Sequence, residues 1–266
     1  MSGSEDVIRR ELEASSMSAR FAIGTWLVLA QVIAGLCVSG QAMASAYEVG
    51  DTDIGTGWKA KVQIGIFRAG DELARTHPEL EVGFGFADSL ELAASTGYGR
   101  IETEGGLRRY GRHDTRMALK WRVRQERPGI IGIALEPEVI LPTGDRSAGT
   151  GGEGVQLGLP LRLSRFFGQG RLSGQLAYVH AFVDDRRTVS LGALYEQEVI
   201  AGLWVGVEVL RDHGLDEYGG QEGRAAIGLR WQHSEQLMLF GALGEALHPD
   251  DAEASSSARF GIEYVF

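Results

Sequence analysis

The closing stretch "SSARFGIEYVF", Ser256–Phe266, alternates between apolar and polar residues up to the last position of the chain. Strict alternation of this kind indicates a β-strand with one apolar face, because successive side chains of a strand point to opposite sides. The apolar face carries Ala258, Phe260, Ile262, Tyr264 and Phe266, and the other carries Ser257, Arg259, Gly261, Glu263 and Val265. The stretch therefore predicts a terminal strand that ends on an aromatic residue inside its apolar stripe.

The same alternation recurs along the chain from about residue 58, with no convincing helical period between the runs. Several runs oppose apolar residues to charged ones, as where Met117, Leu119 and Trp121 alternate with Arg116, Lys120 and Arg122. We count twelve runs, at about 58–66, 79–86, 90–98, 116–124, 131–141, 155–163, 172–182, 188–195, 203–209, 225–231, 237–243 and 256–266.

The connections between these runs mostly alternate in length. Tight connections such as "DS", "ERPG", "FGQG" and "HSE" separate longer polar ones at Arg100–Asp114, Pro142–Glu153, Arg211–Glu222 and Ala246–Ser256, and the short "VDDRR" is the exception. Short turns on one rim, long loops on the other and an even strand number are typical of outer-membrane barrels. We therefore predict an all-β fold: a transmembrane antiparallel up-and-down β-barrel of about twelve strands, in one domain at residues 47–266.

A soluble β-sandwich is the alternative, because its strands also alternate. Aromatic residues near strand ends favour the barrel, where they would form girdles at the two lipid interfaces. These residues are Trp58, Tyr98, Tyr178, Phe182, Trp231, Phe260 and Phe266.

The terminal strand also resembles the C-terminal signal that the assembly machinery of bacterial outer-membrane barrels recognises. Closure on the first strand would then satisfy backbone groups that lipid cannot. The expected partners are accordingly the barrel assembly machinery, outer-membrane lipid and lipopolysaccharide.

Residues 1–46 read as an N-terminal extension and secretory signal peptide. The apolar run "FAIGTWLVLAQVIAGLCVSG" is followed by "QAMASA", whose small residues fit a signal-peptidase site. The acidic stretch before Met17 leaves two possible starts, Met1 or Met17, and an uncleaved membrane anchor remains an alternative. Cys37 is the only cysteine, and we expect it to be removed with the signal.

The formal net charge of -10 leaves no basic surplus to hold a phosphate backbone, so we expect no nucleic-acid partner. Together with the signal and the barrel pattern, this predicts a location in the bacterial outer membrane.

Charged residues recur on the polar face of the runs, where an Arg or Lys facing lipid at midplane would cost about 2–4 kcal/mol. They are therefore expected inside the barrel, either as a constriction for a small solute or as a salt-bridged filling. Across the "ERPG" turn, Lys120 would face Glu136 or Arg116 would face Glu138, depending on register. The predicted lumen-lining residues are Lys59, Glu81, Arg116, Lys120, Arg122, Arg124, Glu136, Glu138, Arg162, Glu208, Arg224 and Arg230, with Lys61, Glu91 and Glu263 on the same face.

No catalytic, cofactor or metal site emerges from the sequence. The glycines of "GTGGEG" precede a strand rather than a helix, and the six histidines lack metal-ligand spacing. Asp184-Asp185 and Asp212-His213 leave an outer-membrane protease as a minor alternative.

The stretches "LPTGD" (Leu141–Asp145), "GTGGEG", "VQLGLPLRLSRFFGQG" and "LSGQLAYVHAF" resemble the outer-membrane transporter family associated with the meta-cleavage pathway of phenol degradation. The resemblance covers about the middle third of the chain and implies a barrel that passes small organic molecules, with no catalytic residue. The chain is shorter than that family's pattern and carries dense inward charge. We expect a channel or transporter that passes small polar or organic solutes by passive diffusion, and no enzyme. A structural or surface-interaction barrel with a plugged lumen is the alternative.

Overall fold

The computed structural model describes residues 47–70, 72–103, 106–216, 221–247 and 255–266. Within these ranges no helix is long and apolar enough to cross a membrane. The expected signal peptide at residues 1–46 lies outside the described residues. The strands are β1 (Gly57–Ala69), β2 (Glu72–Ala87), β3 (Leu90–Glu102), β4 (Arg108–Arg112), β5 (Thr115–Arg124), β6 (Gly132–Leu135), β7 (Glu138–Leu141), β8 (Gln156–Phe167), β9 (Gly170–Ala181), β10 (Arg186–Ile200), β11 (Leu203–Gly214), β12 (Gln221–Gln232), β13 (Leu237–Leu247) and β14 (Ser255–Val265).

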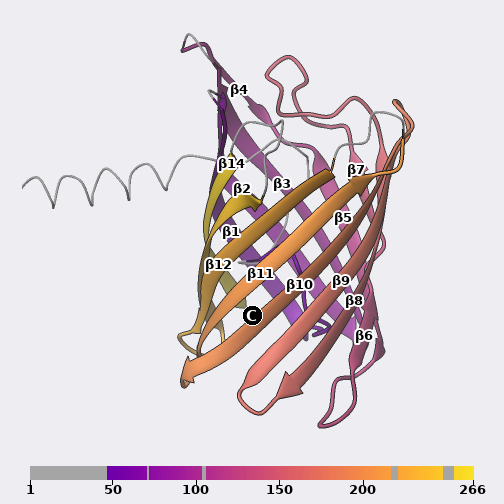
Figure 1. Cartoon of the computed structure of the whole chain (residues 1–266), viewed down its shortest axis with the longest axis vertical. Helices are drawn as coiled ribbons and strands as arrows, with labels where there is room; N and C mark the ends of the chain where they lie inside the picture. Colours follow the sequence, from indigo (N-terminus) through magenta and orange to yellow (C-terminus); the bar gives the residue numbers. More distant parts are fainter. Residues whose placement is uncertain (1–46, 71, 104–105, 217–220, 248–254) are drawn as a thin grey trace, which may run out of the picture.

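The strands form one antiparallel sheet that closes on itself as a barrel (Figure 1). Closure is made by β1 and β14, whose register runs from Lys59 opposite Val265 to Ala69 opposite Ser255. The terminal strand therefore completes the wall, and no strand edge is left open to lipid at this seam. The sheet closure rules out the sandwich.

Two of the wall strands are interrupted, which is why fourteen segments make twelve strands. β4 and β5 both pair with β3, and β6 and β7 both lie between β5 and β8. The second interruption falls at Glu136-Pro137, where proline has no N–H to donate to a ladder. The predicted fold class and strand number are confirmed.

Strand length fits a membrane span. The shortest uninterrupted strands, β13 and β14, have 11 residues each. At a rise of about 3.3 Å per residue and a tilt of about 45°, such a strand spans about 26 Å, close to the apolar band of transmembrane barrels.

On the long-loop rim the wall continues further than the sequence pattern indicated. The expected loop at Arg100–Asp114 contains the end of β3 and all of β4, and the expected loop at Arg211–Glu222 contains the end of β11 and the start of β12. Backbone pairing continues there without the apolar alternation. A strand beyond the lipid no longer needs an apolar face, so alternation underestimates its length.

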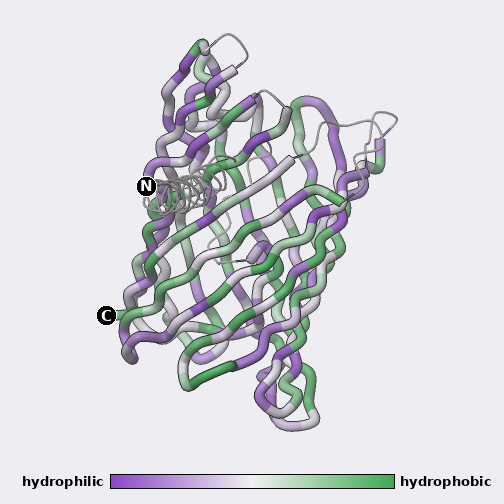
Figure 2. The backbone as a smooth tube through the Cα atoms, turned by 60° about the vertical axis from the view of Figure 1, so that its left-hand side comes forward, coloured by the Kyte–Doolittle hydropathy of each residue, from purple (hydrophilic) through white to green (hydrophobic). Residues whose placement is uncertain are grey.

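The two faces of the wall differ sharply in polarity, and the tube in Figure 2 alternates between hydrophobic and hydrophilic residues along the strands. On β10, Leu191 is 63% exposed, whereas the adjacent Ser190 is 1% exposed. Large apolar residues cover the outside and buried polar or charged residues the inside. This polarity is the reverse of that of a soluble protein.

The aromatic residues expected at the interfaces are all exposed on the outer surface, from 40% for Tyr178 and Trp231 to 76% for Phe266. Phe260 lies in the middle of β14, opposite Ile64 of β1, rather than near a strand end. Its expected interfacial position is therefore wrong. β14 has almost the bounds of the predicted run at 256–266, in which Phe260 already lies near the middle.

Candidate lumen site

Residues 47–56, "YEVGDTDIGT", precede β1 and lie inside the barrel; we call them the inner segment. They pair with no strand in the described part of the chain. Tyr47, Val49 and Thr52 are nevertheless only 2%, 1% and 0% exposed. The inner segment is thus enclosed by the wall without being part of it.

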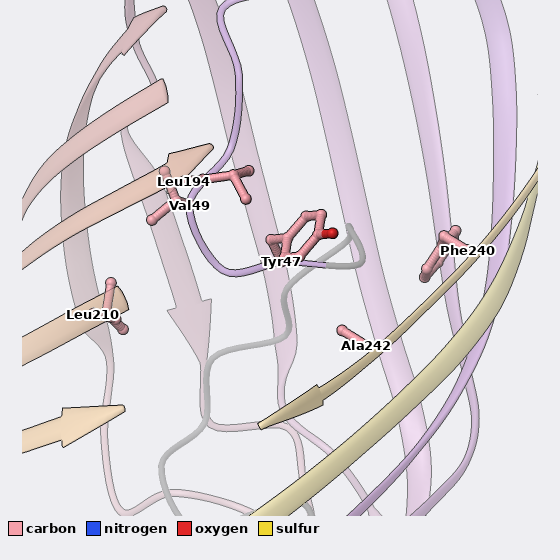
Figure 3. Packing of buried hydrophobic residues seen from close by; sticks show 6 residues of the cluster. All are labelled: Tyr47, Val49, Leu194, Leu210, Phe240 and Ala242. Atoms are coloured by element: carbon pink, nitrogen blue, oxygen red, sulfur yellow. The ribbon is translucent and has the colours of Figure 1, made fainter. Parts of the chain in front are cut away.

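The start of the inner segment packs into an apolar cluster on the inside of the wall (Figure 3). Tyr47 and Val49 meet side chains from β10, β11 and β13. These partners are Leu194, Leu210, Phe240 and Ala242. Such apolar side chains are unexpected on the inner face of a wet barrel, and the inner segment explains them.

Glycines in the wall make room for the inner segment. A Cβ atom on Gly206 would lie 2.7 Å from the Tyr47 hydroxyl oxygen, and one on Gly228 would lie 3.0 Å from the ring of Tyr47. A Cβ on Gly192 would collide with Val49. The wall is therefore shaped to receive these two side chains.

Each of the three carboxylates of the inner segment lies on a basic side chain of the wall. The Glu48 Oε1 atom is 2.7 Å from Arg224 Nη1, Asp51 Oδ1 is 3.1 Å from Lys120 Nζ, and Asp53 Oδ2 is 2.7 Å from Arg171 Nη1. The segment itself contains no basic residue. Charge complementarity therefore holds an acidic segment against three basic positions.

Wall carboxylates accept the backbone N–H groups of the inner segment. Glu208 accepts from Glu48, at 3.1 Å, and from Val49, while Glu91 accepts from Gly55 at 2.8 Å. The hydroxyls of Thr52 and Ser164 are 2.5 Å apart. These bonds satisfy buried donors that would otherwise be costly to remove from water.

The docked position changes the acidity of Asp51. Burial alone would raise the pKa of this carboxyl, but the charges of Lys120 and Arg171 outweigh burial and hold the pKa well below its usual range. Asp51 is therefore an anion in the docked segment.

Most other charged side chains inside the barrel form ion pairs with each other along the inner face of the wall. Arg116 Nε lies 2.7 Å from Glu138 Oε2, and Arg116 Nη2 lies 3.2 Å from Glu136 Oε1. Arg162 reaches the other oxygen of Glu136 at 2.8 Å. Of the two alternative pairings across the "ERPG" turn, the structure forms Arg116–Glu138.

Lys59, Lys61 and Arg230 also pair with wall carboxylates. Lys61 lies 3.4 Å from Glu81 and 3.3 Å from Glu263, and Lys59 lies 2.6 Å from Glu91. Arg230 makes two bonds to the Glu196 carboxylate, at 2.6 and 2.9 Å. These pairs link strands that are adjacent, as for Lys61, or separated by one strand, as for Lys59 and Arg230.

Ten of the twelve predicted lumen residues make the inner contacts described above. The other two, Arg122 and Arg124, lie at the short-turn rim. Arg122 donates to the backbone oxygen of Asp88, and Arg124 Nε donates to that of Ile131 at 2.7 Å. Both arginines hold turns rather than meeting partners across the interior.

The inner segment was not predicted from the sequence, and neither were two inner wall residues. Arg171 and Glu196 share the parity of buried neighbours and could have been found by extending the alternation. The sequence feature that could have indicated the inner segment is the presence of three acidic residues, with no Lys or Arg among them, directly before the first strand.

The residues considered for a protease make structural contacts at different places in the barrel. Asp212 accepts from Ser190 and from Arg224 at 2.6 Å, while His213 is exposed. His180 lies 3.0 Å from Asp185 at the rim. Among the described residues, no group of three or more His, Cys, Asp or Glu side chains is placed to hold a metal ion.

Comparison with known proteins defines the class of fold. No family model and no curated protein matches the chain. Solved structures do: the chain is a closed twelve-stranded barrel of the kind found in outer-membrane porins and channels.

An outer membrane channel from Pseudomonas putida F1 is 15% identical, covering 82% of this chain and 98% of that one, with a TM-score of 0.61. The NanC porin is 7% identical, covering 78% and 100%, with a TM-score of 0.58. The KdgM porin in complex with disordered oligogalacturonate is 9% identical, covering 77% and 99%, with a TM-score of 0.52. At these identities the likeness shows a shared fold.

Proposed function

We propose that the chain is an outer-membrane channel that passes small polar or organic solutes by passive diffusion, and that the inner segment occludes it at rest. One observation carries the proposal. In the described part of the chain, the inner segment occupies the lumen without being a wall strand, and it is held by side chains and not by strand pairing. It can therefore leave without opening the wall.

The polarity of the wall supports the proposed placement in the membrane. An apolar outer belt suits acyl chains, and an interior of paired charges suits water. With cleavage of the expected signal after Ala46, the inner segment would form the first ten residues of the mature chain. β14 and the following Phe266 would then be the part offered to the barrel assembly machinery, and lipopolysaccharide would contact the rim of long loops.

Release of the inner segment is physically accessible. On release, the carboxylates of the inner segment would be solvated by water. The cations they leave would keep other partners, since Arg224 also pairs with Asp212 and Arg171 with Glu126. The larger loss is the burial of Tyr47 and Val49, at about 1.5–3 kcal/mol for each fully buried large apolar side chain. Docking of this strength is compatible with a minor open population.

The barrels of similar fold include channels and porins, and the resemblance to the phenol-degradation transporter family points to organic solutes. Neither assigns a solute to this chain. The dense ionic lining supports polar solutes over wholly apolar ones.

A structural or surface-interaction barrel with a permanently plugged lumen is the second candidate. It is favoured by the cross-wall ion pairs of Arg116, Lys61 and Arg230, which stiffen the inner face. The two candidates differ in whether the inner segment ever leaves.

Single-channel recording in planar bilayers tests the proposal. The Tyr47→Ala/Val49→Ala variant removes the apolar anchors of the inner segment. Leu191→Ala/Val209→Ala is the matched control, because these outward residues lie on β10 and β11, the strands that pack against Val49.

We expect small or rare current steps from the wild type and larger or longer openings from the anchor variant, with the control behaving as wild type. If folded barrels of all three proteins pass no current, the channel proposal is wrong and the plugged structural barrel is correct. Folding is checked by the heat-dependent shift in gel migration.

A further inference from the structure

We infer that Lys120 and Arg171 form an anion site in the lumen, which binds the carboxylate of a small organic acid when Asp51 and Asp53 leave. The inference rests on the proposed channel function and adds a substrate class to it. In the docked state the inner segment occupies this site with its own carboxylates.

Arg171, on β9, is fixed in place by groups outside the inner segment. Its Nη2 atom lies 2.8 Å from Glu126 and 3.2 Å from Ser164 Oγ, and its Nε lies 3.1 Å from the same Glu126 oxygen. Its guanidinium also lies over the Phe166 ring, at 4.9 Å. Only Nη1 is used by the inner segment, at 2.7 Å from Asp53 and 3.4 Å from Asp51. Undocking therefore frees one donor of a guanidinium that stays fixed.

Lys120, on β5, depends on the inner segment more completely. Its only ion pair among the described residues is with Asp51. Glu91, which lies opposite Lys120 in the β3–β5 register, pairs with Lys59, and Glu136 pairs with Arg116 and Arg162. Undocking thus leaves an ammonium group without a partner of its own.

Water reaches this part of the lumen even while the inner segment is docked. The Asp53 side chain is 60% exposed and that of Asp51 is 26% exposed, whereas Arg171 beneath them is 3% exposed. A solute carboxylate can therefore approach from the side on which Asp51 and Asp53 are exposed. It can then compete with them for Lys120 and Arg171.

The chemistry favours a carboxylate over a neutral solute. A charge-assisted hydrogen bond is about twice as strong as a neutral one, and two cations stand within reach of one carboxylate at Asp51. By contrast, Arg116 and Arg162 form ion pairs with the wall acids Glu138 and Glu136, and these pairs do not depend on the inner segment.

The test uses single-channel current through the full mature chain carrying Asp51→Asn/Asp53→Asn, which neutralises the resident carboxylates. Sodium succinate is added as the probe, and 1,4-butanediol as a neutral molecule of the same length. Lys120→Gln is then introduced into this background, and Lys120→Arg tests whether charge restores the effect. Lys61→Gln is the matched control, because it removes the same charge from a lysine whose ion pairs, among the described residues, are all with wall acids.

We expect succinate to block the current and butanediol not to. Removing one charge about 4 Å from the bound anion in water is worth about a fivefold rise in the blocking concentration, which we expect for Lys120→Gln. Lys120→Arg and Lys61→Gln should leave the blocking concentration unchanged.

Equal effects of succinate and butanediol, or equal effects of Lys120→Gln and Lys61→Gln, would overturn the anion site while the channel proposal stands. Absence of current from every folded variant would instead overturn the channel proposal and the anion site with it.

Discussion

The wall and the inner segment lie against each other but are held by different forces. Each wall strand pairs with neighbours on both sides through its backbone, as β1 does with β2 and β14. The inner segment pairs with no described strand and is held by Tyr47, Val49, three carboxylates and two wall glutamates. Backbone pairing tolerates many sequences, whereas side-chain docking requires particular ones. The wall thus depends on backbone pairing, whereas the inner segment depends on particular side chains.

The largest expected effect comes from breaking the wall's inner ion pairs. Arg116→Glu places a third carboxylate beside Glu136 and Glu138, and loss of a buried partner costs about 3–5 kcal/mol. We expect the urea midpoint of the folded barrel in lipid vesicles to fall accordingly.

The double variant Arg116→Glu/Glu138→Arg should recover a large part of that loss. If the single reversals are harmless, or the double reversal restores nothing, pairing between these two residues does not stabilise the wall.

A charge on the outer face of the wall comes next. Ile227 lies in the middle of β12 and is 55% exposed on the apolar side. Ile227→Arg should lower the unfolding free energy in lipid by about 2–4 kcal/mol, because the charge would face acyl chains. The measurement is the same urea titration, with Ile227→Ala as control. An arginine tolerated here as well as alanine would mean that this face does not contact lipid.

Placing a larger wall side chain in the space that the inner segment now occupies should have a smaller effect on stability but a clear effect on conductance. Gly192→Leu places a side chain where Val49 now packs, so the segment should be displaced while strand pairing of β10 is retained. We expect longer channel openings in bilayer recordings.

Gly174→Ala, also on the wall, is the control, because its Cβ would meet only a backbone oxygen at 3.9 Å. Channel behaviour shared by the two variants would show that glycine loss in the wall, and not displacement of the inner segment, changes the current.

The smallest effect is expected from mild acid. Because docking lowers the pKa of Asp51, its stabilising contribution is fully present above the pKa of free aspartate, about 3.9, and is lost only as pH falls further. Between pH 8 and pH 5, open probability should therefore not change through this carboxyl. An opening in that range that disappears in Asp51→Asn would contradict the docked geometry of Asp51.

The sequence predicted the wall well, because every strand needs an apolar face toward the lipid and this need repeats at every second residue. A run such as Met117 to Trp121 has one face for acyl chains, so a period of two residues is visible without any structure. Prediction was weaker where a strand extends beyond the lipid and no longer needs an apolar face. The extra pairing of β4, Arg108–Arg112, lies where no apolar alternation marks it.

The charges were harder to assign than the strands. Parity placed Lys120 and Glu136 on one face, but the partner of Lys120 proved to be Asp51, 69 residues away in sequence. Arg122 and Arg124 share that parity and still end on turn carbonyls. Parity gives the side of the wall and not the height along the barrel, and height decides which ions meet.

The sequence by itself determined a closed all-β wall with an apolar outside, because alternation and backbone pairing are local or repeated properties. Only the tertiary structure decided that residues 47–56 lie inside the barrel and which cations hold them. The reason is geometric: the apolar and basic groups that receive the segment come from β5, β9, β10, β11, β12 and β13, and they meet only once the barrel has closed.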